Sequence, residues 1–457
     1  IWQKGFSNLL KLEKKSEEQS SSPMKTKVLL GHRRPADGKL FYHATACPSP
    51  NFSTLEGDHH ADVCVVGGGL TGVSTALHLA KSGISVALLE AQRIGCGASG
   101  RNGGHIANGF SCELTRMEKM LGFEATKMLW QMVDSYLVDI DQNILTHGIQ
   151  CDRKFGYIYA ANNSYQMREL ALLNDRLKSK YNYQKTTLLH KSELGKFLRT
   201  AQYSGGLFDK TCGQINPFKY LQGLVKQLKT MNVKIFEQSP AQAISPGSDL
   251  TVHAEKGRIK SKYVLLAGNA YLSCNTPLLE DKSIPVSSFV GVTTPLSRAS
   301  IQSILPRDVT VADCNKIPDY YQIIAGNRML FGCGINFLGK EPKTFRKIIS
   351  SRIKRLFPQL TSFELEYAWS GLISSTTNKL PHIGQINSQI YYAQGFSGHG
   401  VVLSGLIGKL ISEAIMGNSG GFELFSRIKH KKLPPHPIKS IGLGIANLLH
   451  KLQQDFK

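Results

Sequence analysis

The sequence predicts an α/β fold in which a doubly wound parallel sheet is joined to a discontinuous α+β second domain. Two observations predict it. An apolar run at 61–66, a glycine turn, a helical pattern and a second apolar run at 84–90 form a βαβ unit. The chain of 457 residues also exceeds what one core usually holds, and β-rich and helical segments separate this unit from the later strands of its domain.

Domain boundaries follow from changes of pattern along the chain. Polar, breaker-rich residues come first and predict a flexible extension. Strands that end in glycine turns are assigned to the first domain, and the segments that interrupt them to the second. The predicted parts are the extension 1–40, the first domain 58–110, 201–283 and 365–420, the second domain 111–200 and 284–364, and a basic tail 421–457.

Apolar periodicity predicts the main elements. Pro217 suits the first turn of a helix, and Gly257 suits the turn of a hairpin. The predicted helices lie within 70–83, 111–149, 164–180, 217–232, 340–356 and 401–417, and the predicted strands within 61–66, 84–90, 155–160, 233–239, 263–267 and 390–394.

The distribution of basic and aromatic residues argues against nucleic acids as partners. There are 55 Lys and Arg against 33 Asp and Glu, a formal net charge of +22. The basic clusters at 343–355 and 427–439 are not interleaved with aromatic residues as a base-stacking surface requires, so we expect no specific nucleic-acid binding. A weak contact with an anionic membrane surface and an acidic substrate both stay open.

Cysteine usage indicates a reducing compartment. The nine cysteines are odd in number, scattered, and contain no CxxC or Cys/His pair at metal-ligand spacing. We therefore expect no metal and a cytoplasmic location. No apolar run reaches the roughly 18 residues that a membrane-spanning helix needs.

The first glycine turn carries a dinucleotide signature. Gly67-x-Gly69-x-x-Gly72 joins a predicted strand to a helix, and Glu90 ends the next strand. Gly67 allows a tight turn, Gly69 lets backbone approach a pyrophosphate, and Gly72 lets helix and sheet pack closely, while Glu90 accepts hydrogen bonds from ribose hydroxyls. The alternative is a glycine loop used only for packing. The predicted contacts here also include Leu70, Thr71 and Ala91.

The segment 93–104 favours FAD over a nicotinamide dinucleotide. It follows the second strand directly and is dense in glycine, with Ser, Arg and Asn. Such a backbone can wrap a diphosphate and an isoalloxazine ring, which nicotinamide enzymes do not need at this place. The predicted contacts are Arg93, Ser99, Gly100, Arg101, Asn102, Gly103 and Gly104.

From about Phe41 onward the chain resembles a known family. The motifs are FYHATA, ADVCVVGGGLTG, ASGRNGG, VLLAGNAYL, YAWSG, LPHIG and YYAQGFSGHG. Together they resemble the γ-glutamylputrescine oxidase branch of the D-amino-acid-oxidase-like FAD oxidoreductases, although Cys96 and His105 depart from the residues expected there. The resemblance implies a glutathione-reductase-like FAD domain and an antiparallel-sheet substrate domain. Since no cysteine follows Cys333, where sarcosine-oxidase relatives attach their flavin, it also implies non-covalent FAD.

The loop 395–400 precedes a long apolar helix, so its backbone N–H groups and the positive helix end face whatever lies above them. In the resemblance this is the flavin pyrimidine ring, and the helix end stabilises the charge that reduction places there. The alternative is a turn that serves packing only. The predicted contacts are Ala267, Gly268, Gly398 and Gly400.

His399 and His105 are the catalytic candidates, because an imidazole titrates near neutral pH and both lie beside predicted flavin loops. Structural roles are the alternative for each. The resemblance places Tyr271, Trp369 and the Tyr320-Tyr321 pair near the flavin, and it implies that they bind substrate. Tyr321 is preferred to Tyr320 because alternation turns only one of them to the cavity. For these aromatics the alternative is core packing.

The resemblance implies an enzyme that oxidises the C–N bond of an amine. Hydride passes from the amine carbon to FAD, the imine hydrolyses to an aldehyde, and oxygen is reduced to hydrogen peroxide. The implied substrate is γ-glutamylputrescine or a similar polyamine or amino-acid derivative. Two alternatives stay open: an N-methyl or D-amino-acid dehydrogenase that passes electrons to a quinone-type acceptor, and a non-catalytic flavin-binding partner or maturation protein.

The phosphate-loop assignment gives a first test. Gly69→Asp should abolish FAD retention, because it places a carboxylate against the pyrophosphate. The absorbance of the purified protein near 450 nm measures the outcome, and a variant that stays yellow would show that the assignment is wrong.

Overall fold

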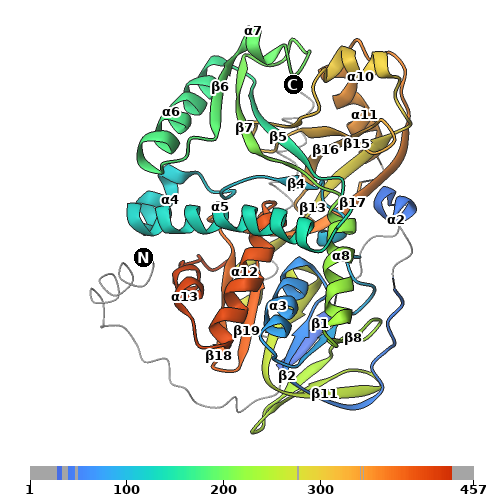
Figure 1. Cartoon of the computed structure of the whole chain (residues 1–457), viewed down its shortest axis with the longest axis vertical. Helices are drawn as coiled ribbons and strands as arrows, with labels where there is room; N and C mark the ends of the chain where they lie inside the picture. Colours follow the sequence, from blue (N-terminus) through green and yellow to red (C-terminus); the bar gives the residue numbers. More distant parts are fainter. Residues whose placement is uncertain are drawn as a thin grey trace.

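The structure is a computed structural model that describes residues 28–32, 40–46, 50–274, 277–339, 341–342 and 344–434. Two mixed β-sheets form its framework. In Figure 1 the first sheet, with helices α3, α8 and α12 beside it, occupies the lower half, and the second sheet the upper half. The long helix α5 (Phe123–Thr146) crosses between them. The fold class that the sequence predicts is confirmed.

The centre of the first sheet is parallel. β2 pairs with β11 and β3, β3 pairs with β8, and β19 pairs with β11, all in parallel. Antiparallel strands β10, β9, β1 and β12 continue the sheet beyond β11. The strands are β1 (Val28–His32), β2 (Gly57–Val66), β3 (Val86–Leu89), β8 (Lys234–Phe236), β9 (Ala243–Ser245), β10 (Leu250–His253), β11 (Gly257–Leu266), β12 (Leu272–Cys274), β18 (His382–Asn387) and β19 (Ile390–Gln394).

Both faces of this parallel centre are covered, as its continuous apolar runs require. Alternate residues of β2 enter two different cores. Val65 packs with the cluster that includes the apolar side chains of α3 and α12. Cys64 packs with Ile244 and Val252 of the antiparallel strands. The second face is therefore covered by strands rather than by further helices.

The second sheet is antiparallel except where β14 pairs with β5. Its strand order is β17-β13-β16-β15-β14-β5-β7-β4, and β6 pairs with β7. The strands are β4 (His105–Ile106), β5 (Lys154–Ala161), β6 (Thr186–His190), β7 (Gly205–Gln214), β13 (Ser283–Thr293), β14 (Thr310–Asp313), β15 (Tyr320–Ile324), β16 (Arg328–Asn336) and β17 (Leu365–Thr376).

Helices cover the sheets and join them. The predicted helices at 164–180 and 340–356 appear as α6 and α11, and the 111–149 segment divides into α4 and α5 at Gly122, which has φ +82°. The remaining bounds are α2 (Phe41–Thr45), α3 (Leu70–Lys81), α4 (Leu114–Leu121), α6 (Ser164–Lys180), α7 (Lys191–Leu194), α8 (Pro217–Thr230), α9 (Pro277–Glu280), α10 (Arg298–Ile304), α11 (Phe345–Leu356), α12 (Gly400–Ile415), α13 (Gly420–Ser426) and the 3₁₀ turns η1 (Ala98–Gly100) and η2 (Asn269–Tyr271).

Three predicted boundaries differ from the structure. The strands β4, β7 and β17 lie in the second sheet, although their residues were assigned to the first domain, because long-range pairing and not local pattern selects the sheet. Residues 28–32 form β1, although the extension 1–40 was expected to be flexible. The tail 421–457 begins with most of α13. Residues 1–27, 33–39 and 435–457 lie outside the described part.

Helices α3 and α12 approach each other through glycines. A Cβ at Gly408 would lie 2.6 Å from the Thr71 oxygen and 2.8 Å from Ser74 Cβ. The hydroxyls of Ser74 and Thr75 donate to the carbonyls of Gly405 and Gly408 at 2.7 and 3.0 Å. This close crossing brings the amino ends of both helices to one edge of the first sheet.

The crossing can be tested at Gly408. Alanine normally stabilises a helix interior by about 1 kcal/mol relative to glycine. At Gly408 the overlap outweighs this, so Gly408→Ala should lower the free energy of unfolding by about 1–3 kcal/mol in urea titrations. The control is Gly195→Ala, whose Cβ would meet nothing nearer than 3.5 Å. A Gly408→Ala protein as stable as the wild type would contradict the role given to this contact.

Candidate functional site

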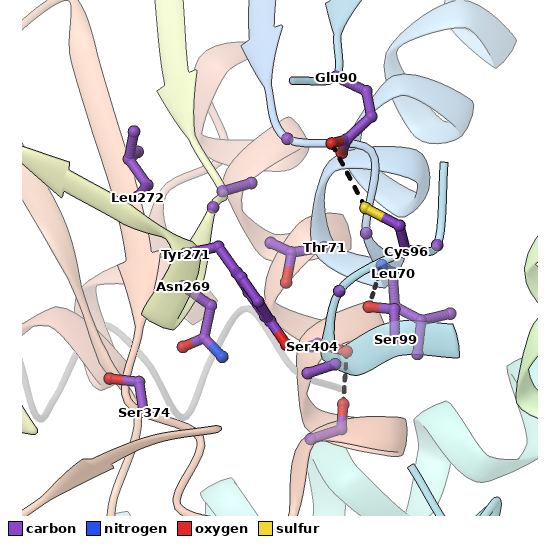
Figure 2. A pocket seen from close by; sticks show the side chains of 18 of the residues that line it. Leu70, Thr71, Glu90, Cys96, Ser99, Asn269, Tyr271, Leu272, Ser374 and Ser404 are labelled. Atoms are coloured by element: carbon purple, nitrogen blue, oxygen red, sulfur yellow. Dashed lines mark hydrogen bonds between the residues drawn. The ribbon is translucent and has the colours of Figure 1, made fainter. Parts of the chain in front are cut away.

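A cavity of about 1190 Å³ lies between the amino ends of α3 and α12, where β2, β3 and β11 end (Figure 2). Doubly wound sheets bind their ligands at this edge. Many of the predicted cofactor residues line it: Gly67, Gly69, Leu70, Thr71, Glu90, Ala91, Ser99, Asn102, Ala267, Gly268, Gly398 and Gly400. The others do not: Gly72, Arg93, Gly100, Arg101, Gly103 and Gly104.

The first glycine turn has the backbone that its sequence predicts. Gly67 has φ +119°, and a Cβ there would lie 2.9 Å from the carbonyl group of Ala267. A Cβ at Gly72 would lie 2.0 Å from the Gly67 oxygen. At Gly69 the nearest atom is unexpected, since the Ser99 hydroxyl lies 2.8 Å from the Cβ position and accepts from the Leu70 N–H at 2.9 Å. The two glycine-rich loops therefore touch.

Glu90 is held in a fixed orientation at the cavity wall. One carboxylate oxygen accepts from the Gly68 N–H at 2.8 Å and the other from the Gln92 N–H at 2.9 Å. Burial raises the pKa of Glu90, while these hydrogen bonds oppose the rise. The carboxyl group retains capacity to accept from a ligand hydroxyl.

The sequence analysis missed a second acid beside Glu90. Glu237 follows β8, the neighbour of β3, and accepts from the Ile94 N–H at 2.7 Å. It is 5% exposed, and its carboxylate adds to the rise in the pKa of Glu90. Its signal was available, because FEQS ends a predicted parallel strand at the same sheet edge. Glu237 does not itself line the cavity; lining residues that were missed include Cys96, Asn269, Ser374 and Ser404 (Figure 2).

Residues of the 93–104 segment that do not line the cavity shape the loop. Arg101 is buried, and its guanidinium donates to the carbonyls of Cys96 and Ser370 at 2.6 and 3.3 Å. Arg93 is exposed. Asn102, which does line the cavity, donates to the Ser99 carbonyl at 3.0 Å and accepts from the Gly104 N–H at 2.7 Å.

The three glycines of this segment that do not line the cavity are required by packing. A Cβ at Gly100 would lie 2.1 Å from the Gly95 oxygen, and one at Gly104 would lie 2.0 Å from the Ile215 oxygen. A Cβ at Gly103 would lie 2.5 Å from the Tyr320 ring. These close approaches give each of the three a packing role, and their part as cofactor contacts stays a prediction.

The loop 395–400 is folded back on itself at the other end of the cavity. Gly395, Ser397 and Gly398 have φ of +78°, +54° and +90°. The Ser397 hydroxyl accepts from the Thr376 N–H at 3.2 Å and donates to the Gly395 oxygen at 3.1 Å. With the first turn of α12, this loop presents the positive end of a helix to the cavity.

The two catalytic candidates lie close together. His105 bonds through Nδ1 to the Tyr157 hydroxyl at 3.1 Å, and the Nε2 atoms of His105 and His399 are buried without a partner among the described residues. Burial, and then the neighbouring His399, lower the pKa of His105 to about 3. Burial lowers the pKa of His399 to about 4. Both imidazoles are neutral at pH 7.

Two of the three predicted substrate aromatics lie in cores. Tyr321 is fully buried and stacks on Phe331 at 5.6 Å, so the choice of Tyr321 over Tyr320 was wrong. Trp369 packs against Tyr42 and is 2% exposed, so its expected place at the substrate was also wrong. Their flanking sequences give no sign of this, because alternation does not say which sheet face is the core.

Tyr320 and Tyr271 are only partly buried, and of the two Tyr271 lines the cavity while Tyr320 does not. The Tyr320 ring lies 4.9 Å from the His105 ring and covers Gly332, where a Cβ would come within 1.9 Å of it. Tyr271 lines the cavity and accepts from the Leu372 N–H at 3.1 Å. Its role in substrate binding stays a prediction.

The family model for FAD dependent oxidoreductases of the DAO type matches residues 62–414. The chain belongs to this family. It is 34% identical over 397 residues to the γ-glutamylputrescine oxidoreductase of Escherichia coli, covering 86% of this chain and 92% of that protein. It is 37% identical over 383 residues to the probable oxidoreductase OrdL of Haemophilus influenzae, covering 83% and 88%. These matches confirm the resemblance that the motifs indicate.

Solved structures show the same fold in this family of FAD oxidoreductases. An L-proline dehydrogenase from P. horikoshii superposes with a TM-score of 0.66 at 20% identity, covering 79% of this chain and 94% of that one. A glycine oxidase from Geobacillus kaustophilus superposes with a TM-score of 0.65 at 20% identity, covering 79% and 95%.

The residues around the cavity of this FAD oxidoreductase suit the cofactor. It is elongated between two helix amino ends, which suit a diphosphate and a ring that gains negative charge, and Glu90 stands where hydroxyl groups can be bound. Among the described residues no three His, Cys, Asp or Glu side chains are grouped to hold a metal. None of the described helices has the length and apolar character to cross a membrane.

The buried imidazoles predict acid sensitivity. Their folded-state pKa values lie below the ordinary histidine value of 6.5, so between about pH 6.5 and 4 the unfolded chain binds protons that the native state does not. The free energy of unfolding should therefore fall as pH falls through this window. The double variant His105→Gln/His399→Gln should flatten the slope in urea titrations at pH 7.5, 6 and 5. The exposed His60→Gln is the control, and an equal slope in the double variant would contradict the assignment.

Proposed function

We propose that this FAD oxidoreductase oxidises the C–N bond of an amine and reduces oxygen to hydrogen peroxide. The observation that carries the proposal is the pair of neutral, buried imidazoles, His105 and His399, next to the loops that enclose the cavity. The similarity to γ-glutamylputrescine oxidoreductase supports γ-glutamylputrescine or a related polyamine derivative as the substrate. The net reaction consumes amine, oxygen and water and yields aldehyde, ammonia and hydrogen peroxide.

The cofactor-binding roles follow from the cavity. The amino end of α3 would hold the diphosphate, Glu90 the ribose hydroxyls, and the loop 395–400 with the amino end of α12 the flavin ring. FAD, when bound, supplies the two-electron acceptor for the amine carbon. A non-covalent attachment is supported by Cys96, the cysteine that lines the cavity, because burial and Glu90 raise its thiol pKa to about 12.

The histidines act in this proposal as neutral hydrogen-bonding groups. An imidazole with a pKa of about 3 or 4 is a weak base at pH 7 and takes up little of the proton of an ammonium ion. No lysine or arginine contributes to the lowered pKa of either ring. The amine therefore binds after it has lost its proton to solvent, with Tyr320 as the aromatic surface beside it.

This gives a pH prediction. With putrescine as substrate, kcat/KM should rise with pH until the amine is neutral, because the neutral amine is the form that binds. No additional titration should appear between pH 5 and 8. In His399→Asn the rise of kcat/KM with pH should keep its position on the pH axis, while kcat falls. An acid limb near pH 6.5 that disappears in His399→Asn would instead assign proton transfer to His399.

The direct test is an anaerobic absorbance titration of the holoenzyme near 450 nm with γ-glutamylputrescine, putrescine, sarcosine and D-alanine, followed by air and a peroxide assay. Bleaching by γ-glutamylputrescine or putrescine and recovery in air with peroxide is the expected result. Bleaching that air does not reverse would favour a dehydrogenase with another acceptor. A flavin that no amine bleaches would favour a binding or maturation protein.

The cellular setting is a separate proposal. A cytoplasmic location is supported by the cysteine pattern of the sequence and by seven cysteines whose side chains the structure describes, all of which are free. A weak contact with an anionic membrane surface rests on the basic tail alone.

A further inference from the structure

Surrounding contacts hold the loop 395–400 in an unfavourable backbone conformation. Ser397 has φ +54°, a region that residues other than glycine seldom occupy, and it lines the cavity. Its N–H donates to the Ser374 oxygen at 2.9 Å, and its oxygen accepts from the Ser111 hydroxyl at 2.7 Å. Such backbone strain persists where surrounding contacts over-determine it.

The bond from Thr376 to the Ser397 hydroxyl belongs to a larger network. Thr376 ends β17 and is 2% exposed. Its own hydroxyl lies 2.8 Å from the Leu380 oxygen and 3.0 Å from Asn378 Oδ1, and Oδ1 also accepts from the Leu380 N–H at 3.1 Å. Asn378 is therefore the centre of a tight turn, and Thr376 at the start of this turn is hydrogen-bonded to Ser397 of the loop 395–400, which we name the cofactor loop.

Asn378 has one more bond, and it leads to the C-terminal segment. Its Nδ2 donates to the Lys429 oxygen at 3.1 Å. Residues 429–434, which we name the clamp segment, are attached beside this turn at further points. The His430 ring packs on His382 with ring centres 4.8 Å apart, and the Leu433 N–H donates to the Asp281 oxygen at 2.7 Å.

We propose that the clamp segment holds the cofactor loop in shape through Asn378, Thr376 and Ser397. No residue from 429 to 434 lines the cavity, so its effect on FAD is indirect and Asn378 is a positioning residue. The last core residue before it is Ile428, which is 5% exposed, so the segment can be removed without opening the core. The C-terminal end of the chain thus governs how long the flavin stays bound.

The asymmetry of the Asn378 side chain gives a selective variant. In Asn378→Asp the oxygen that serves Thr376 and Leu380 is kept, but the donor to Lys429 is lost. Two truncations bracket the clamp segment. Deletion of 429–457 removes it, and deletion of 435–457 leaves it in place and serves as the matched control.

The readouts are the rate of FAD release from the full holoenzyme, followed by the rise in flavin fluorescence, and the visible circular dichroism of the bound flavin. Asn378→Asp and the 429–457 deletion should each release FAD about tenfold faster, the value of a lost buried hydrogen bond, and should change the dichroism band. The 435–457 deletion should behave as the wild type. Adding Asn378→Asp to the 429–457 deletion should bring no further increase, because both remove the same bond.

Equal release rates in the two truncations would overturn the proposal. If the longer truncation does not fold, Asn378→Asp in the full-length chain decides alone, and a wild-type release rate and dichroism would overturn it. Neither measurement needs a substrate. A protein that oxidises no amine would still answer this question, so its failure is separate from that of the proposed function.

Discussion

The close crossing of α3 and α12 is the contact on which the site depends. Gly408 lets the two helices approach closely enough for the hydroxyls of Ser74 and Thr75 to donate to carbonyls of α12, and the amino ends of both helices then meet at one sheet edge. Each amino end has N–H groups that find no acceptor within the helix itself, and it carries part of a positive charge. One end suits the diphosphate of FAD, and the other suits the ring that becomes negative on reduction. A dinucleotide with charge at two separate places needs both.

Local sequence predicted the part of the fold that local physics determines. The βαβ unit has its strand, its turn with Gly67 at positive φ, its helix and Glu90 where the pattern placed them, since each depends on residues within about 30 positions of one another. Sheet membership was less accessible. β17 carries apolar residues suited to either sheet. Its partner β13 lies some 80 residues earlier in the chain, and such a long-range pairing was not visible in the sequence of β17 alone.

The site shows the same division. Glycines and the carboxylate at the ends of parallel strands were predictable, because only certain residue types suit those positions. The aromatic residues were not, because Tyr320 and Tyr321 are adjacent and of the same type, and only the packing of Phe331 on one face decides between them. Glu237 lay between these cases. Its position at the end of a strand was visible, but its approach to Glu90 requires that β8 pair with β3.

One strand connects the two halves of the molecule beside the cofactor cavity. β17 pairs with β13 along the second sheet, its last residues line the cofactor cavity, and Ser375 forms a bridge to Phe396 beyond the end of β19 in the first sheet. A hinge between the halves would have to bend or break this strand. A change in the distance between the two sheets would therefore strain β17 and its bridge to Phe396, whereas loops and side chains around the cavity can move without that cost.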